Sequence, residues 1–159
     1  MKFFVILIML ITSITAHAFE YRKWEVTDPP NKAKGKTALE RWQSINTGNY
    51  IYLIRESCWC RPSYLTKVVV IDNKVVFAEP MRQLIPSDQI LPLDDYKTVE
   101  GLFQMIKEYI NDTPDEFEQR IDYSLHYPRK FSVDPALHSR DDEYQFEIIE
   151  LVFIKTKKT

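Results

Sequence analysis

The stretch from Tyr50 to Phe77 decides the fold, and its letters are YIYLIRESCWCRPSYLTKVVVIDNKVVF. It holds three runs rich in aromatic and β-branched residues, the residue types that favour β-strands. Between the second and third runs stands the pair Asp72-Asn73, and both residue types tolerate the positive φ angles of a type I′ hairpin turn. We therefore expect three successive strands, the last two joined by a two-residue turn.

The expected hairpin has a definite register. A turn at Asp72-Asn73 pairs Val70 with Val75 and Val68 with Phe77, which gives one wholly apolar face. The opposite face carries lysines beside apolar residues (Lys67, Val69, Ile71, Lys74 and Val76), so we expect it to be only partly covered.

Two helices flank this stretch. Thr37 and Glu40 have the spacing of a capping box and open a short helix that ends before Gly48. Thr98 caps a longer helix, which Asn111 to Pro114 ends. That helix carries one apolar stripe of helical period: Val99, Leu102, Phe103, Ile106 and Ile110.

The second half of the chain predicts three more strands. From Phe117 to Tyr127 apolar residues alternate with polar ones, as in a half-buried strand that Pro128 would break. A shorter strand holds Phe131 and Val133, and the last one runs from about Tyr144 to Ile154. The fold class is therefore α+β, an antiparallel sheet of about six strands with two helices packed on one face, in the order α-βββ-α-βββ.

The N-terminus predicts export. Lys2 precedes an apolar run over residues 3–11, and Ala16-His17-Ala18 has the small-x-small pattern of a signal-peptidase site. We expect a signal peptide over 1–18, an extended arm over 19–36, one α+β domain over 37–155 and a basic tail over 156–159. The expected location is the periplasm or the exterior, with no membrane span left after cleavage. The net charge of −2 argues against a nucleic-acid partner.

Cys58 and Cys60 are the only cysteines and lie on one face of the first expected strand. Residues two apart in a strand have Cα atoms roughly 6.6 Å apart, near the upper end of the disulfide range of about 4.4–6.8 Å. A bond between them therefore needs a bulge or a strand end. A local disulfide staple, a redox-active or partner-linked thiol pair, a metal-linked pair and buried reduced thiols all stay open.

Other candidate sites carry weaker signals. Aromatic residues with polar tips suit a sheet core and also a binding face. Core packing is the default expectation here and a binding face the alternative, whose candidates are Tyr50, Tyr52, Trp59, Tyr64 and Tyr127. Asp134, Asp141, Asp142 and Glu143 supply calcium-type oxygens but lack the spacing of a calcium loop. The sequence has no nucleophile elbow, and its three glycines provide no phosphate-cradling loop, so we expect no catalytic residue, no metal and no cofactor.

The chain resembles a bacterial family of small exported proteins, domain of unknown function 6174, over about Trp42 to Leu151. The likeness lies in Asn49-Tyr50-x-Tyr52, Cys58-Trp59-Cys60, Val68-x-Val70, Asp72-Asn73-x-Val75, Thr98-Val-Glu-x-Leu-Phe103, Ile121-x-Tyr123, Tyr127-Pro128 and Asp141-Asp142-Glu143. Where the family has Tyr-Asp followed by Gly-Tyr-Pro, this chain has Tyr123-Ser124 and His126-Tyr127-Pro128. The resemblance implies export and a shared fold, and no activity or cofactor.

Two functions follow as hypotheses. The first is an exported, non-catalytic binding or envelope accessory module for a protein or small-molecule ligand of the cell envelope. The alternative is a thiol-redox or metal-linked protein that uses Cys58 and Cys60.

Overall fold

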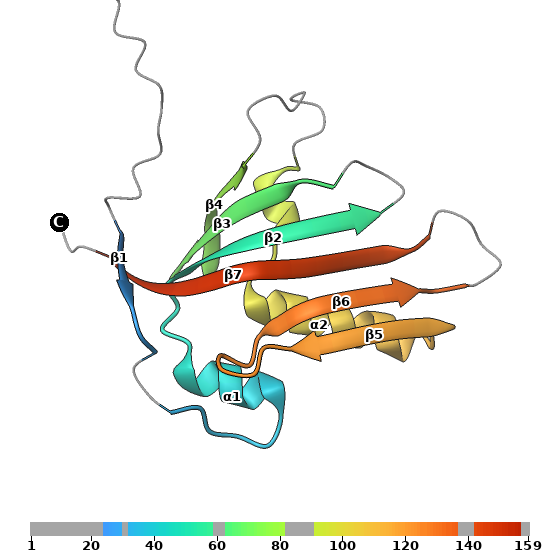
Figure 1. The fold of residues 1–159 in the computed structure, drawn as a ribbon, viewed down its shortest axis with the longest axis horizontal. Coiled ribbons are helices and arrows are strands. Elements are labelled where there is room, and N and C mark those ends of the chain that lie inside the picture. Colours follow the sequence, from blue (N-terminus) through green and yellow to red (C-terminus); the bar gives the residue numbers. More distant parts are fainter. Residues whose placement is uncertain (1–23, 30–31, 59–62, 82–90, 137–141, 157–159) are drawn as a thin grey trace, which may run out of the picture.

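A computed structural model describes residues 24–29, 32–58, 63–81, 91–136 and 142–156 (Figure 1). These residues form two α-helices, a short 3-10 helix and one antiparallel sheet of seven strands. In chain order the elements are β1 (Trp24–Thr27), α1 (Ala38–Ile45), β2 (Tyr50–Cys58), β3 (Leu65–Ile71), β4 (Lys74–Pro80), η3 (Leu93–Asp95), α2 (Val99–Asn111), β5 (Glu116–Ile121), β6 (Pro128–Asp134) and β7 (Tyr144–Thr156). The α+β class with an antiparallel sheet is confirmed.

The strand order is β4-β3-β2-β7-β6-β5, with β1 paired to the C-terminal end of β7. The two halves of the chain therefore meet at the β2–β7 ladder, in which every residue of β2 has a partner on β7. Part of the expected N-terminal arm is a strand, because Trp24 lies opposite Thr156 and Thr27 opposite Phe153. This strand raises the number from the expected six to seven. Its sequence is only four residues long, too short to show a period.

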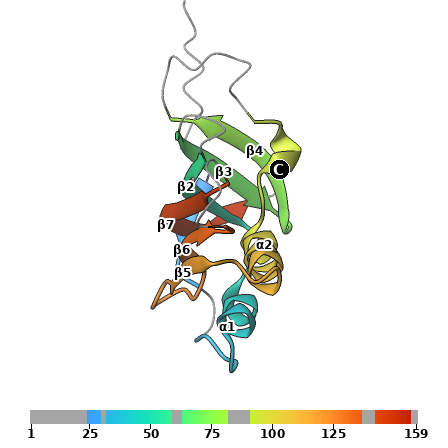
Figure 2. The ribbon, with the colours of Figure 1, turned by 90° about the vertical axis from the view of Figure 1, so that its right-hand side faces the viewer.

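Both helices lie on one side of the sheet, and none of the helices that the structure describes lies on the other side (Figure 2). We call the helix-free side the open face. The buried core fills the space between the helices and the sheet, with Trp42 of α1 at its centre. The Trp42 ring stacks on Phe153 at 5.6 Å between centroids and meets the edge of Tyr50 at 5.2 Å. Such aromatic contacts add to the stabilisation from buried apolar area.

Both expected helix starts are confirmed. Thr37 and Glu40 form a reciprocal capping box at the start of α1, and the Thr98 hydroxyl accepts a hydrogen bond from Gly101 N at the start of α2. The stripe of α2 faces the sheet through its buried residues Val99, Leu102 and Ile106.

The β3–β4 hairpin is confirmed at its turn and corrected beyond it. Asp72 and Asn73 have φ angles of 49° and 59°, and Val70 lies opposite Val75 as expected. A bulge then inserts Val76, so Phe77 lies opposite Val69 and not opposite Val68. Since one extra residue moves every later side chain to the other face, Phe77 packs on the open face.

The strand expected from Phe117 to Tyr127 is also corrected. The strand β5 ends at Ile121, and residues 122–127 form a turn whose exposed tip is Tyr123. The Asp122 carboxylate starts this turn, because its Oδ1 accepts hydrogen bonds from the backbone N atoms of Ser124 and Leu125 at 2.9 and 2.8 Å. Pro128 therefore begins β6 and does not end a longer strand.

Candidate functional site

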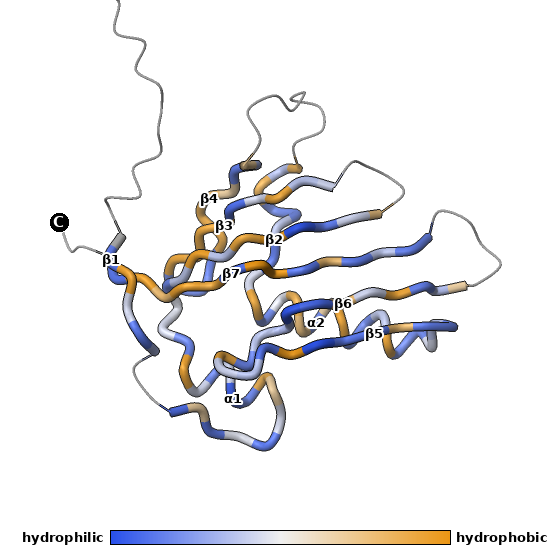
Figure 3. The backbone as a smooth tube through the Cα atoms, viewed as in Figure 1, coloured by the Kyte–Doolittle hydropathy of each residue, from blue (hydrophilic) through white to orange (hydrophobic). Residues whose placement is uncertain are grey.

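The open face divides into an apolar part and a polar part. Ile51, Val69 and Ile154 form a buried apolar cluster where β2, β3 and the end of β7 lie together. Figure 3 shows this part in orange and the strand β5 mostly in blue. The polar part covers the C-terminal ends of β2 and β6 and the N-terminal ends of β7 and β5, which lie side by side in the antiparallel sheet.

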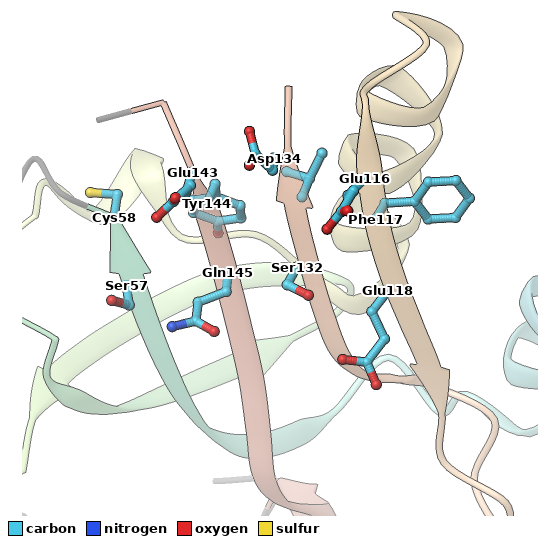
Figure 4. A pocket seen from close by; sticks show the side chains of 11 residues that line it. Ser57, Cys58, Glu116, Phe117, Glu118, Ser132, Asp134, Glu143, Tyr144 and Gln145 are labelled. Atoms are coloured by element: carbon cyan, nitrogen blue, oxygen red, sulfur yellow. The ribbon is translucent and has the colours of Figure 1, made fainter. Parts of the chain in front are cut away.

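A row of four polar side chains crosses that polar part. Ser57 lies opposite Gln145, Gln145 opposite Ser132, and Ser132 opposite Glu118. Since directly opposed residues of neighbouring strands share a face, all four project from the open face. Figure 4 shows them on the near side of the strands, with α2 behind the sheet. We call them the polar row.

The polar row lies in a groove of about 780 Å³. This volume falls within the range of about 300–1,000 Å³ that is usual for ligand sites. We call it the strand-end groove, and it is lined by Ser57, Cys58, Glu116, Phe117, Glu118, Ser132, Val133, Asp134, Glu143, Tyr144 and Gln145.

The strand-end groove is acidic. Its lining contains four carboxylates, from Glu116, Glu118, Asp134 and Glu143, and no lysine or arginine. Asp134 lies opposite Glu116 on the neighbouring strand. Because close like charges disfavour each other unless a cation lies between them, this lining suits a positively charged group.

A second row of charged residues borders the groove. Arg55 lies opposite Glu147, Glu147 opposite Lys130, and Lys130 opposite Arg120. The two rows are linked through Glu118, which accepts hydrogen bonds from Arg120 Nε at 2.7 Å and Lys130 Nζ at 2.8 Å. The hydrogen bond from Lys130, and then the one from Arg120, lowers the pKa of Glu118. Glu118 is therefore ionised at neutral pH.

Tyr144 supports the groove from the helix side of the sheet. Its ring stacks on Tyr109 of α2 at 5.8 Å and an interplanar angle of 10°, and its hydroxyl donates to Glu56 Oε1 at 2.8 Å. Cys58 lies opposite Tyr144 in the β2–β7 ladder. The cysteine end of β2 thus belongs to the same part of the molecule as the groove.

Tyr50, Tyr52 and Tyr127 belong to the core, the default expectation for them, and not to the alternative binding face. Tyr50, Tyr52 and Tyr127 are 0%, 1% and 4% exposed and belong to the core cluster. The Tyr50 hydroxyl accepts a hydrogen bond from Val99 N at 2.9 Å, and the Tyr52 hydroxyl donates to the carbonyl of Lys97. Burial raises the pKa of both hydroxyls, so they remain protonated. Tyr50 and Tyr52 fix the start of α2 on the sheet, and none of the three tyrosine side chains is accessible to a partner.

The other expected site residues are placed in part. Cys58 is partly buried and lines the groove, and Tyr64 is partly buried just before β3. Trp59 and Cys60 lie outside the described residues. The structure therefore places only one member of the cysteine pair.

The expected acidic loop contributes to the groove. Asp134 and Glu143 line it, whereas Asp142 is not among its lining residues and Asp141 lies outside the described part of the chain. Within that part no group of three or more His, Cys, Asp or Glu residues is arranged to hold a metal ion. No described helix is long and apolar enough to cross a membrane.

The polar row was not expected as a site. Its sequence signal is weak: polar residues alternate with apolar ones at the start of the last strand, at Glu143 just before it and at Gln145 and Glu147 within it. Such alternation predicts a solvated face. It does not predict which strands lie side by side, and the row depends on the order β2-β7-β6-β5.

Comparison with known proteins agrees with the resemblance seen in the sequence. Neither the curated proteins nor the solved structures contain a match to this chain. The model of one protein family matches residues 34–152, which include both helices and the strands β2 to β6. The chain therefore belongs to the family of unknown function DUF6174.

Proposed function

We propose that this chain is an exported, non-catalytic binding module whose ligand occupies the strand-end groove. The observation that carries the proposal is the groove itself, which places the polar row from four neighbouring strands in one concavity of about 780 Å³. Sites built on paired strands hold their side chains more firmly than sites on loops.

The lining favours a polar, positively charged ligand. Hydroxyl and amide groups from Ser57, Ser132 and Gln145 supply both donors and acceptors. The carboxylates of Glu116, Asp134 and Glu143 supply negative charge, whereas that of Glu118 is paired with Arg120 and Lys130. Amines and guanidinium groups complement such a lining through charge-assisted hydrogen bonds. A lysine- or arginine-containing segment of an envelope protein has this chemistry.

A titration with a basic peptide tests the proposal. The probe is blocked tetralysine, and blocked tetraglutamate is the matched peptide of opposite charge. Backbone amide shifts of the mature protein should move at Ser57, Ser132 and Gln145 with the first peptide only. Ser132→Lys, which puts a cation inside the groove, should weaken binding at least about tenfold, equal to about 1.4 kcal/mol.

The control for that variant is Gln43→Lys. Gln43 is exposed on α1, whose Trp42 stacks on Phe153 near the C-terminal end of β7, whereas Gln145 of the groove lies at the N-terminal end of the same strand; its substitution therefore adds the same charge away from the groove. If Gln43→Lys weakened tetralysine binding as much as Ser132→Lys, or if the amide shifts were spread over the whole surface, the groove would not be the site.

A thiol-redox function is the second candidate. The observation that favours it is that Cys58 lines the end of the strand-end groove, although its side chain, opposite Tyr144, lies on the helix side of the sheet. No described cysteine is a free thiol, and we propose a Cys58–Cys60 disulfide. Intact mass after alkylation, with and without prior reduction, tests this disulfide. Alkylation should occur only after reduction, and the intact mass should be that of a monomer. Labelling without reductant would exclude both the staple and a stored oxidant.

Export is part of the proposal and rests on the sequence. The apolar run after Lys2 and the Ala16-His17-Ala18 site support cleavage after residue 18 and a periplasmic or secreted mature protein. Expression of the full chain in a bacterium, followed by fractionation and N-terminal mass mapping, should recover a mature form that begins at Phe19. Recovery of the uncleaved chain from the cytoplasm would contradict export.

A further inference from the structure

The strand β5 ends the sheet on one side, and no described strand pairs with its outer side. A strand in this position leaves half of its backbone N–H and C=O groups without a sheet partner. Natural edge strands avoid further pairing by charged side chains, bulges, prolines or a covering element, and of these β5 has charged residues, which are of both signs. The segment Glu116–Ile121 contains no proline, and its exposed Phe117 side chain (52%) lies on the side of the sheet opposite to Glu118.

The other end of the sheet differs in each of these respects. The strand β4 carries the bulge at Val76, ends at Pro80 and contacts η3. These features hinder the addition of another strand. Of the two ends of the sheet, β5 is therefore the open one.

The sequence of β5 complements itself in one antiparallel register. When two copies of Glu116–Ile121 are placed antiparallel about Gln119, Glu118 of each copy lies opposite Arg120 of the other. Phe117 then lies opposite Ile121 on the helix side. Opposite charges and apolar pairs in direct cross-strand positions stabilise a sheet, and this register provides each of them twice.

We propose that β5 is the dimerisation strand of this protein, with a second copy of the same chain as its partner. The two strands pair about a two-fold axis at Gln119 and form one continuous antiparallel sheet. This is an isologous contact, which closes as a dimer and does not continue as a fibre. Arg120 is available for it, because its side chain is 68% exposed and Glu118 holds it at the edge at 2.7 Å.

In this dimer the open faces of the two copies lie side by side on one surface. A two-fold axis perpendicular to the sheet keeps both open faces on the same side, and Glu116 and Glu118 belong both to β5 and to the groove lining. The dimer would therefore present two grooves on one surface. A ligand with two cationic segments would gain from this arrangement through effective concentration. The dimer itself does not depend on what the groove binds.

Sedimentation equilibrium of the mature protein over a concentration series tests the proposal. Wild type should show a reversible monomer–dimer equilibrium. Arg120→Glu turns two attractive pairs into two like-charge pairs, so its dimer Kd should rise at least about tenfold. The double variant Glu118→Arg/Arg120→Glu restores opposite charges across the axis and should dimerise again. Thermal melting of each variant confirms that the monomer is folded.

The control is Lys74→Glu, which makes the same charge change at the exposed start of β4, the other sheet edge. It should leave the dimer Kd within about twofold of wild type. A monomeric wild type up to high micromolar concentration would overturn the proposal. So would a dimer that Lys74→Glu weakens as much as Arg120→Glu, or a double variant that is folded and stays monomeric.

Discussion

Glu100, in the first turn of α2, accepts a hydrogen bond from the indole Nε1 of Trp42 in α1 at 2.7 Å. The same carboxylate oxygen, Oε1, accepts a second hydrogen bond from Asn46 Nδ2 at 2.6 Å. Trp42 is fully buried, so its N–H group has no access to water. Glu100 therefore joins the two helices and satisfies the polar atom of the largest core side chain.

The first prediction concerns this carboxylate. Glu100→Ala should lower the free energy of unfolding by about 2–3 kcal/mol, because it leaves the buried Trp42 N–H without an acceptor. Glu100→Gln keeps an oxygen acceptor and should cost less. Urea unfolding followed by tryptophan fluorescence measures both.

The control for Glu100→Ala is Glu108→Ala on the exposed side of α2. Glu108 accepts only a surface hydrogen bond from Gln104 at 2.8 Å, so its loss should change stability by less than about 0.5 kcal/mol. Equal losses in the two alanine variants would show that the Trp42 hydrogen bond does not stabilise the helix junction.

The second prediction concerns the loop that meets the hairpin turn. Gly48 has φ +80°, and a Cβ atom there would lie 3.2 Å from Asn73 Nδ2, while its carbonyl accepts from Asn73 N at 2.9 Å. Gly48→Ala should therefore destabilise the protein by about 1–2 kcal/mol. Gly101→Ala is the matched control, because Gly101 has helical φ inside α2 and its neighbour Lys97 is exposed. The new Cβ would lie 3.2 Å from Lys97 Cβ, as close as the one at Gly48 to its neighbour, but the helix favours Ala over Gly, so Gly101→Ala should lower stability by no more than about 0.5 kcal/mol. An equal loss at both sites would contradict the conformational argument.

These local features were predictable from the sequence because short-range chemistry determines them. Thr37 and Thr98 bond to amides within three residues, and Asp72-Asn73 adopts its turn from its own φ preferences. Features that depend on residues far apart in sequence could not be predicted in this way. The side of the sheet on which Phe77 lies depends on a bulge against β3, and the polar row depends on which strands became neighbours.

The tyrosines show a second limit of the sequence. A tyrosine hydroxyl suits an interface and also suits a buried hydrogen bond, and the residue type does not distinguish them. Tyr50 and Tyr52 find their partners on the backbone at the start of α2, which lies about fifty positions away in sequence. Because these partners are so distant in sequence, the burial of Tyr50 and Tyr52 could be determined only from the three-dimensional structure.

The third prediction is a pH dependence at the β5–β6 turn. Burial raises the pKa of Asp122, but hydrogen bonds from Leu125 N and from Ser124 outweigh it, so the pKa is lowered overall. A folded pKa below the unfolded value stabilises the protein above the unfolded pKa, about 3.9, and this stabilisation is lost as the pH falls through the folded pKa. Asp122→Ala should cost about 1 kcal/mol at pH 7.

The loss of stability caused by Asp122→Ala should shrink as the pH is lowered below the unfolded pKa of about 3.9. Urea unfolding of wild type and variant at neutral and strongly acidic pH measures the difference. The control is Asp94→Ala, because Asp94 is an exposed acidic residue of η3 and lies outside the β5–β6 turn. A stability difference between wild type and Asp122→Ala that stayed constant from neutral to acidic pH would mean that the ionised carboxylate does not hold the turn.

The fourth prediction concerns the proposed Cys58–Cys60 bond. It closes a ring of only three residues, so chain entropy limits its stabilisation to roughly 1.5 kcal/mol. Cys58→Ser/Cys60→Ser should therefore lower the free energy of unfolding by about that amount or less, and reduction of wild type should have the same effect. Unchanged stability in both cases would exclude a structural staple and favour the redox alternative. A much larger loss in the variant than on reduction would mean instead that packing of Cys58 beside Tyr144, and not the ring, stabilises this end of β2.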